Sequence, residues 1–299
     1  MKKVLSVILF VAVAALVWYL FINPYDYRVR FKANTFAGAI NQTIKTWDKT
    51  KTVVEPVIQE GDIYHLKQQL KFGDSIQTYN WQIEPIDATT SLVKIGIKDK
   101  NNSLLNRLTI PFKDTDFENR TKKELLEFND VLSEHIKIFK VKIEGEEELG
   151  ATSCACVSLA GPQMSKANGM MQNYNYLSSL VSQYDIELNG RPFIQVNHWD
   201  MQKDSISYDF CFPIIPSENL PEWKNISYKK FYGGTMLKAI YNGNYITSDR
   251  AWYALLDYAD KNNIAVENTP VEFFFNNPNM GVNETSWKAE IYLPLKVND

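Results

Sequence analysis

Two stretches decide the fold of the second half of this chain: YDFCFPI at residues 208–214 and AEIYLPL at residues 289–295. Each has the alternating side-chain pattern of a β-strand, and each carries a proline next to its last residue. Asp209 and Glu290 occupy equivalent places in the two stretches. We therefore predict that this half of the chain contains one structural unit twice.

The spacing of other residues supports this internal repeat. Gly161 precedes Gly243 by 82 residues, and the prolines and isoleucines that follow recur at nearly the same offset. Each copy predicts a strand, a glycine-containing turn, an amphipathic helix and two further strands. The two copies are expected at about residues 149–215 and 231–296, within a domain spanning residues 143–299.

Alternation along the final strand of each copy predicts a binding face. Lys288, Glu290 and Tyr292 share one face of the last strand, and Asp209 lies on the corresponding face of the first copy. If the two strands lie side by side, both carboxylates project from one open face. Aromatic rings next to a carboxylate suit a lipophilic or cationic small molecule.

The second copy contains four motifs in order, which are Gly243-Asn244-Tyr245, Ala251-Trp252-Tyr253-Ala254-Leu255-Leu256, Asn277-Pro278 and Glu290-Ile291-Tyr292-Leu293-Pro294. With these motifs, this half of the chain resembles the gyrase-inhibitor-like effector-binding domain, which also occurs in multidrug-responsive transcription activators. The resemblance implies a small-molecule effector and a central pocket glutamate, which matches Glu290. The first copy departs from the family pattern, because Pro162-Gln163 replaces the turn tyrosine and its helix has no tryptophan.

The candidate ligand-binding residues come from the two copies together. Glu290 is the principal candidate, and the others are aromatic except for one aspartate. For each carboxylate the alternative is a solvated surface position, and for the ring-bearing residues Trp252, Phe273 and Phe275 it is core packing. The complete set is Glu290, Tyr292, Asp209, Tyr245, Trp252, Phe273 and Phe275.

The N-terminus contains an apolar run from Val4 to Ile22, preceded by two lysines. About nineteen helical residues cross most of a bilayer core, so residues 1–24 predict an uncleaved transmembrane anchor. The alternative is a cleaved signal peptide, whose apolar region is usually shorter. Two lysines on a very short tail favour a cytoplasmic N-terminus, which places the bulk of the chain on the extracytoplasmic (periplasmic) side.

Residues 25–142 have a strand, a helix, several antiparallel strands and a long final helix between about Asp116 and Lys140. This order resembles the START-like, polyketide-cyclase-like superfamily. The resemblance implies a helix-grip fold, which often holds an apolar ligand between its long helix and its sheet. The alternative is a packed spacer without a cavity. The fold class expected for the whole chain is α+β.

Composition narrows the functional classes. The net charge of −3 and the absence of a basic run argue against nucleic acid as a partner. Three cysteines and three scattered histidines imply neither a disulfide scaffold nor a metal site, and no cofactor is expected. The acidic run at residues 144–148 predicts a solvated linker.

Three functions stay open from the sequence. The first is small-molecule binding at the membrane, because none of the usual catalytic motifs is present. The second is hydrolysis of a small reactive electrophile, which requires that burial raise the pKa of Glu290 toward neutrality. The third is interaction with, or inhibition of, an unidentified protein partner at the membrane.

Overall fold

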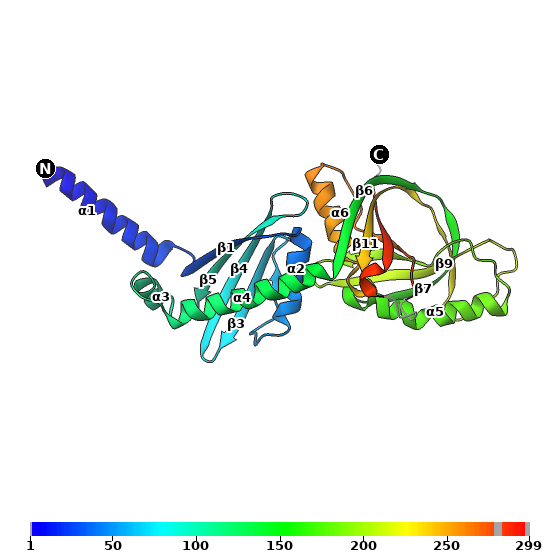
Figure 1. Cartoon of the computed structure of the whole chain (residues 1–299), viewed down its shortest axis with the longest axis horizontal. Coiled ribbons are helices and arrows are strands. Elements are labelled where there is room, and N and C mark those ends of the chain that lie inside the picture. The colour runs from blue at the N-terminus through cyan, green and yellow to red at the C-terminus, as the bar shows by residue number, and fades with distance from the viewer. Residues whose placement is uncertain (1, 278–282, 297–299) are drawn as a thin grey trace. The chain divides into compact units, whose positions relative to one another are not determined.

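The computed structural model describes residues 2–277 and 283–296, which form a mixed α/β protein with antiparallel sheets (Figure 1). The chain divides into two compact units, unit 1 at residues 1–134 and unit 2 at residues 135–299. Each unit is built around its own sheet.

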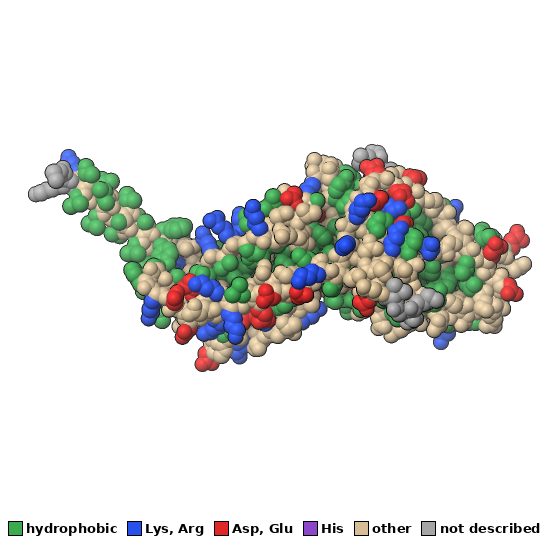
Figure 2. Space-filling model, viewed as in Figure 1, with side chains coloured by type: hydrophobic (Ala, Val, Ile, Leu, Met, Phe, Trp, Pro, Cys, Tyr) green, Lys and Arg blue, Asp and Glu red, His purple; other side chains and the backbone are tan. Residues whose placement is uncertain are grey.

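The chain starts with a long apolar helix. Helix α1 (Lys2–Val17) continues into a π-helical turn, η1 (Trp18–Ile22). Residues 3–22 are long and apolar enough to cross a membrane, and none of this segment is buried. Apolar side chains cover α1 along its visible length in Figure 2. These properties fit a membrane anchor or a signal sequence.

Unit 1 contains a five-stranded antiparallel sheet in the order β1-β5-β4-β3-β2. Its strands alternate between buried apolar and more exposed polar residues, so one face forms a core. Trp47 from α2, Trp81 from β4 and Phe128 from α4 meet there, with ring centroids 4.8–6.3 Å apart. The elements are β1 (Tyr27–Ala33), α2 (Ala37–Asp48), β2 (Ile58–Gln59), β3 (His65–Phe72), β4 (Ser75–Pro85), β5 (Ser91–Asp99), α3 (Ser103–Thr109) and α4 (Asp116–Lys137).

Unit 2 contains a strongly curved eight-stranded antiparallel sheet (Figure 1) in the order β10-β7-β9-β8-β12-β13-β11-β6. The elements are β6 (Phe139–Leu149), β7 (Thr152–Pro162), η2 (Gln163–Ser165), α5 (Lys166–Gln183), β8 (Phe193–Asp200), β9 (Ser205–Ile214), β10 (Ser227–Phe231), β11 (Gly234–Gly243), η3 (Tyr245–Thr247), α6 (Arg250–Lys261), β12 (Val271–Phe274), η5 (Glu284–Ser286) and β13 (Lys288–Pro294).

The strand register shows how Asp209 and Glu290 are related. Strands β8 and β12 pair at the middle of the sheet, with Ile194 opposite Glu272. Asp209 lies opposite Gln195 on β8, and Glu290 lies opposite Phe273 on β12. The two carboxylates therefore share one face of the sheet. However, β9 and β13 do not lie side by side, as the sequence analysis had considered, because β8 and β12 lie between them.

In the part of the chain that the structure describes, helices cover only the face opposite to Asp209 and Glu290. On β9, Tyr208 and Phe212 point toward α5: a Cβ at Gly169 would lie 2.3 Å from the Tyr208 hydroxyl, and the Tyr174 ring lies 5.3 Å from that of Phe212. Helix α6 packs against β11 and β13. Asp209 alternates with Tyr208, so it and Glu290 lie on what we call the helix-free face.

The cysteines differ from the sequence-based prediction. Cys156 and Cys211 lie directly opposite each other on β7 and β9, with Cα atoms 4.1 Å apart, and form a disulfide. The sequence alone implied no disulfide, because only the strand register brings residues 55 positions apart into contact. Cys154 is buried and is not part of a disulfide.

The acidic run at residues 144–148 was also predicted incorrectly, as a linker. It belongs to strand β6, where Glu146, Glu147 and Glu148 pair with residues of β11. A bulge at Gly145, whose φ is +98°, shifts the register there. Glutamates fit this strand because it lies at the edge of the sheet, where side chains reach water. The preceding helix ends at Lys137, three residues before the expected end.

Candidate functional site on the helix-free face of unit 2

Glu290 is held by a group of polar side chains from β13 and β11. The Lys288 ammonium donates to Oε1 of Glu290 at 2.8 Å, and the Lys238 ammonium lies 3.6 Å from Oε2. The Tyr292 hydroxyl lies 3.0 Å from Oε2. The Glu290 side chain is 18% exposed, so the carboxylate can be reached from solvent.

Tyr292 connects this group to β6. Its hydroxyl lies 3.1 Å from Oε1 of Glu147, and Lys238 donates to Oε2 of the same carboxylate at 2.8 Å. The hydroxyl has one proton, so it donates to Glu147 or to Glu290 at any moment. Burial and these neighbouring carboxylates raise the pKa of Tyr292 above its ordinary value, which keeps it a neutral donor.

The pKa of Glu290 lies below its ordinary value. Burial by itself raises this pKa, but the hydrogen bonds from Lys288 and Tyr292 and the charge of Lys238 lower it by more. Glu290 is therefore a carboxylate near neutral pH. This state suits recognition of a cation and does not suit a general base with a pKa near 7.

The Lys288 ammonium occupies a cation-binding arrangement. It lies between the Glu290 carboxylate at 2.8 Å and the Phe275 ring, whose centroid is 4.3 Å away. The Arg191 guanidinium also lies 4.3 Å from the centroid of that ring. A carboxylate combined with an aromatic face is the arrangement that proteins use to bind organic cations.

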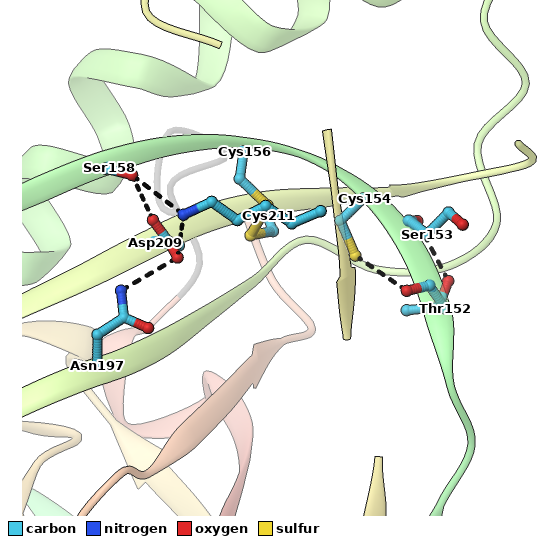
Figure 3. The surroundings of a disulfide bond; sticks show 9 residues. Thr152, Ser153, Cys154, Cys156, Ser158, Asn197, Asp209 and Cys211 are labelled. Carbon is cyan, nitrogen blue, oxygen red and sulfur yellow. Dashed lines mark hydrogen bonds and ion pairs between the residues drawn. A yellow bond between two sulfur atoms is a disulfide. The ribbon is translucent and has the colours of Figure 1, made fainter. Parts of the chain in front are cut away.

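Asp209 forms a similar but less aromatic group on the same face (Figure 3). Its carboxylate accepts from Lys229 at 2.6 Å, Ser158 at 2.5 Å and Asn197 at 3.1 Å. Burial raises the pKa of Asp209, but these donors and the lysine charge lower it by more. The Lys229 ammonium contacts Asp209 and Ser158, and no ring of the described residues packs against it, so this group lacks the second half of the cation-binding arrangement.

A buried apolar cluster lies between the two carboxylates. Phe193 stacks on Phe273 with centroids 5.0 Å apart, and Phe273 meets the Tyr292 ring edge-on at 5.7 Å. The disulfide belongs to the same cluster. Phe273, one of the predicted site residues, thus lies beside Glu290 and is partly buried.

Tyr245 and Trp252 do not join this group. The Tyr245 hydroxyl donates to the backbone oxygen of Lys288 at 2.8 Å, but its ring packs against Phe274 and Trp287 on the helix-covered side. Trp252 is fully buried in α6 against Trp199, with centroids 5.1 Å apart. The structure therefore places both residues in the core.

A cavity of about 250 Å³ lies beside Phe275, which also contacts Lys288. Its wall combines methionines and aromatic rings from α5, β9 and β12 with the guanidinium of Arg191. The lining includes Met170, Met171, Tyr174, Arg191, Phe210 and Phe275.

Sequence reasoning missed several of these residues. Lys238 and the edge-strand Glu147 were not proposed as site residues, because their proximity to Glu290 depends on the pairing of β6, β11 and β13. Lys288 was not proposed either. Alternation along β13 did place Lys288 on the face of Glu290. The methionines of the cavity gave no signal, because methionine on an amphipathic helix is typical of core packing.

Residues 149–296 match the family model of the GyrI-like small molecule binding domain, so this part of the chain is a GyrI-like domain. Of the motif residues, Gly243 ends β11 with a φ of +150°, and Trp252 lies in α6. Pro278 lies outside the described residues.

Several solved structures are similar to this half of the chain. The EcmrR C-terminal domain is 14% identical, with 54% of this chain and 99% of that chain covered and a TM-score of 0.45. SAV2435 bound to tetraphenylphosphonium is 10% identical, with 52% and 94% covered and a TM-score of 0.38. A hydrolase from Listeria innocua is 10% identical, with 52% and 92% covered and a TM-score of 0.35. A comparison with curated proteins gave no match.

Proposed function

We propose that the GyrI-like domain binds a lipophilic cation at Glu290 and Phe275, and that Lys288 occupies the site when no ligand is bound. The single observation that carries this proposal is the position of the Lys288 ammonium between the carboxylate and the ring. A ligand cation would replace the lysine there, and the 38% exposed Lys288 side chain is free to move into solvent.

The cavity lies on the α5 side of the sheet, so the apolar part of the ligand would extend past the Phe275 ring, just beyond the end of β12, to occupy it. Met170, Met171 and Tyr174 supply flexible and aromatic walls, which suit ligands of varied shape. The cavity volume of about 250 Å³ fits a small ligand or one arm of a larger one. Arg191 at the cavity wall disfavours a second cationic group, so we expect a ligand with one positive end.

Binding to matched variants tests this proposal. The full chain would be reconstituted in lipid nanodiscs and its affinity for tetraphenylphosphonium, a neutral lipid and an acidic amphiphile measured by equilibrium dialysis. Partitioning into lipid is the same for every variant, so differences between variants report the protein site. Glu290→Gln should weaken cation binding about tenfold, which corresponds to roughly 1.4 kcal/mol.

Lys288→Met should strengthen cation binding by about threefold to tenfold, because it removes the ammonium that competes with the ligand for Glu290 and Phe275. Loss of the partly exposed Lys288–Glu290 ion pair should change the stability of the fold only slightly. Asp209→Asn is the matched control, since it alters the equivalent carboxylate without an aromatic partner, and it should leave the affinity unchanged. Equal affinities for the unsubstituted chain, Glu290→Gln and Lys288→Met would contradict the proposal.

The hydrolase alternative finds less support at this site. It required a pKa of Glu290 near neutrality, whereas Lys288, Tyr292 and Lys238 keep that pKa low. Glu272 has a pKa raised to about 7 by burial, but it is fully enclosed by protein. Among the described residues of unit 2, no observation specifically favours the protein-partner alternative.

We also propose that unit 2 is a structural duplication. The strand order β7-β9-β8 in one half mirrors β11-β13-β12 in the other, and α5 and α6 occupy matching places in the chain. The pairing of β8 with β12 supports a pseudo-twofold axis near Ile194 and Glu272. Asp209 and Glu290 are equivalent under this axis, as the repeat in the sequence predicts.

For unit 1 we propose a helix-grip fold. A curved antiparallel sheet, an early helix α2 and a long helix α4 occur in the expected order. The space between sheet and long helix is filled by Trp47, Trp81 and Phe128, so we propose that no ligand is held between them.

We propose that residues 3–22 anchor the protein in a cytoplasmic membrane, with both units on the extracytoplasmic side. The exposed apolar surface of α1 supports the anchor. The Cys156–Cys211 disulfide supports the orientation, because disulfides persist in oxidising compartments and are reduced in the cytosol.

A further inference from the structure

Arg107 fastens helix α3 to the end of the apolar N-terminal segment. Its Nη1 donates to the backbone oxygens of Tyr19 at 3.3 Å and Leu20 at 3.0 Å. In return, the Tyr19 hydroxyl donates to the backbone oxygen of Arg107 at 3.1 Å. These contacts satisfy carbonyl groups that the end of a helix leaves without partners.

A buried ion pair fixes the Arg107 side chain in this position. Its Nε donates to Oδ1 of Asp26 at 2.7 Å, and both side chains are almost fully buried. Asp26 also accepts from the Ser103 hydroxyl at 2.5 Å and from the backbone N–H of Asp99 at 2.9 Å. The start of α3, the end of β5 and the end of the apolar segment are therefore tied at one point.

The outer side of α3 is apolar and exposed. Arg107 is the one charged residue of this helix, and it is turned inward. The exposed fraction is 60% for Leu105 and 87% for Phe112, which follows the helix in an exposed turn. Leu104 and Leu108 are exposed as well. We call Leu104, Leu105, Leu108 and Phe112 the α3 apolar patch.

We infer that the α3 apolar patch is a second membrane contact, which inserts into the boundary between headgroups and acyl chains beside the anchor. This inference rests on the proposed anchoring by residues 3–22. Tyr19 and Trp18 lie at the end of the apolar segment, where aromatic residues meet the membrane surface. Since Arg107 ties α3 to Tyr19 and Leu20, the patch is held at the same level as that surface.

A second contact has a mechanical consequence. One helix alone lets a soluble domain rotate and tilt freely about the membrane normal. A helix inserted beside it would restrict that motion for unit 1. The four large side chains of the patch would also lose their contact with water, which favours insertion by an amount that scales with the buried apolar area.

Depth-dependent fluorescence quenching tests the inference on the full chain. Cys154→Ala would remove the one free thiol, after which Leu105→Cys or Phe112→Cys is labelled with an environment-sensitive dye. The labelled chain is placed in nanodiscs made with lipids brominated near the headgroup end of the acyl chains. Both labels should lose about half or more of their fluorescence relative to unbrominated lipid.

Two further label positions make the result decisive. Ala88→Cys lies in the β4–β5 turn, at the other end of a nine-residue strand from α3, and should not be quenched. Leu9→Cys lies within α1 and reports on the anchor itself, especially with bromine placed deeper in the acyl chains.

The outcomes separate the inference from the anchoring on which it rests. Quenching at Leu9 without quenching at Leu105 and Phe112 overturns the membrane contact and leaves the anchor in place. Absence of quenching at Leu9 overturns the anchor. A label at Phe112 that is shielded from an aqueous quencher but not reached by brominated lipid would assign the patch to a second protein chain, and would also overturn the inference.

Discussion

At the scale of single residues, the two carboxylates of the helix-free face have different surroundings. Asp209 and Glu290 each accept from a lysine on the helix-free face, and each has a pKa below its ordinary value. Only Glu290 shares its lysine with an aromatic ring, that of Phe275. Under the proposed duplication these are two equivalent charged positions, and in our proposal the local sequence makes one of them suitable for an organic cation.

Glu272 predicts a pH dependence of stability. Burial raises its pKa from 4.5 to about 7, although Lys166 and a hydrogen bond from Ser248 oppose the shift. Between these two values the folded state holds a proton that the unfolded chain has lost. The free energy of unfolding should therefore fall as the pH rises from about 4.5 to 7, and this contribution should level off above that range.

Glu272→Gln removes this contribution because glutamine does not titrate. The difference in unfolding free energy between the unsubstituted chain and the variant should decrease with rising pH, by at most about 1.4 kcal/mol per pH unit. Urea unfolding between pH 4.5 and 8 measures it, with the exposed Glu267→Gln as control. Parallel pH profiles for the chain and the Glu272→Gln variant would refute the raised pKa.

At the scale of elements, strand pairing determined the structure of a segment that its local sequence predicted incorrectly. Residues 144–148 have the composition of a solvated loop, yet they complete the sheet because β11 offers an unpaired edge. The same pairing carries Glu147 to Tyr292. The tendency of a short sequence to form a loop has little influence when a neighbouring strand provides hydrogen-bond partners for its backbone.

The Cys156–Cys211 disulfide predicts a stability difference for the β7–β9 pair. The loop that it closes spans 55 residues, for which chain entropy gives about 4 kcal/mol of stabilisation. Cys156→Ser combined with Cys211→Ser should lower the unfolding free energy of unit 2 by roughly 2–5 kcal/mol. Urea unfolding followed by tryptophan fluorescence, with and without a reductant, measures the effect.

Cys154→Ala is the control for that experiment, since it keeps the disulfide and its stability should still fall in reductant. Thiol titration of the unfolded, unreduced chain should find one free thiol, that of Cys154. Three free thiols in protein from an extracytoplasmic compartment would contradict both the disulfide and the orientation that it supports.

At the scale of the whole molecule, the proposed anchor would place the ligand site at a membrane. The full chain should then stay with membranes after alkaline carbonate extraction, because residues 3–22 form a helix that is long and apolar enough to cross the bilayer. A protease added to intact spheroplasts should digest both units. Release of the full-length chain by carbonate, or protection of both units from the protease, would argue against the proposed anchor and orientation respectively.

The sequence by itself determined the mixed α and β composition, the apolar N-terminal helix and the GyrI-like half. These features depend on side-chain periodicity and on short motifs, which are local properties of the chain. Alternation along β13 also placed Lys288, Glu290 and Tyr292 on one face.

Only the tertiary structure decided which of the candidate residues meet. It separated Asp209 from Glu290 by two strands, buried Tyr245 and Trp252 in the core, and brought Phe275 to Lys288 beside the carboxylate. The disulfide, the β6 edge strand and the contact between Arg107 and the apolar segment were likewise invisible in the sequence. Each joins residues far apart in the chain, and such contacts depend on strand register and packing, which no local pattern specifies.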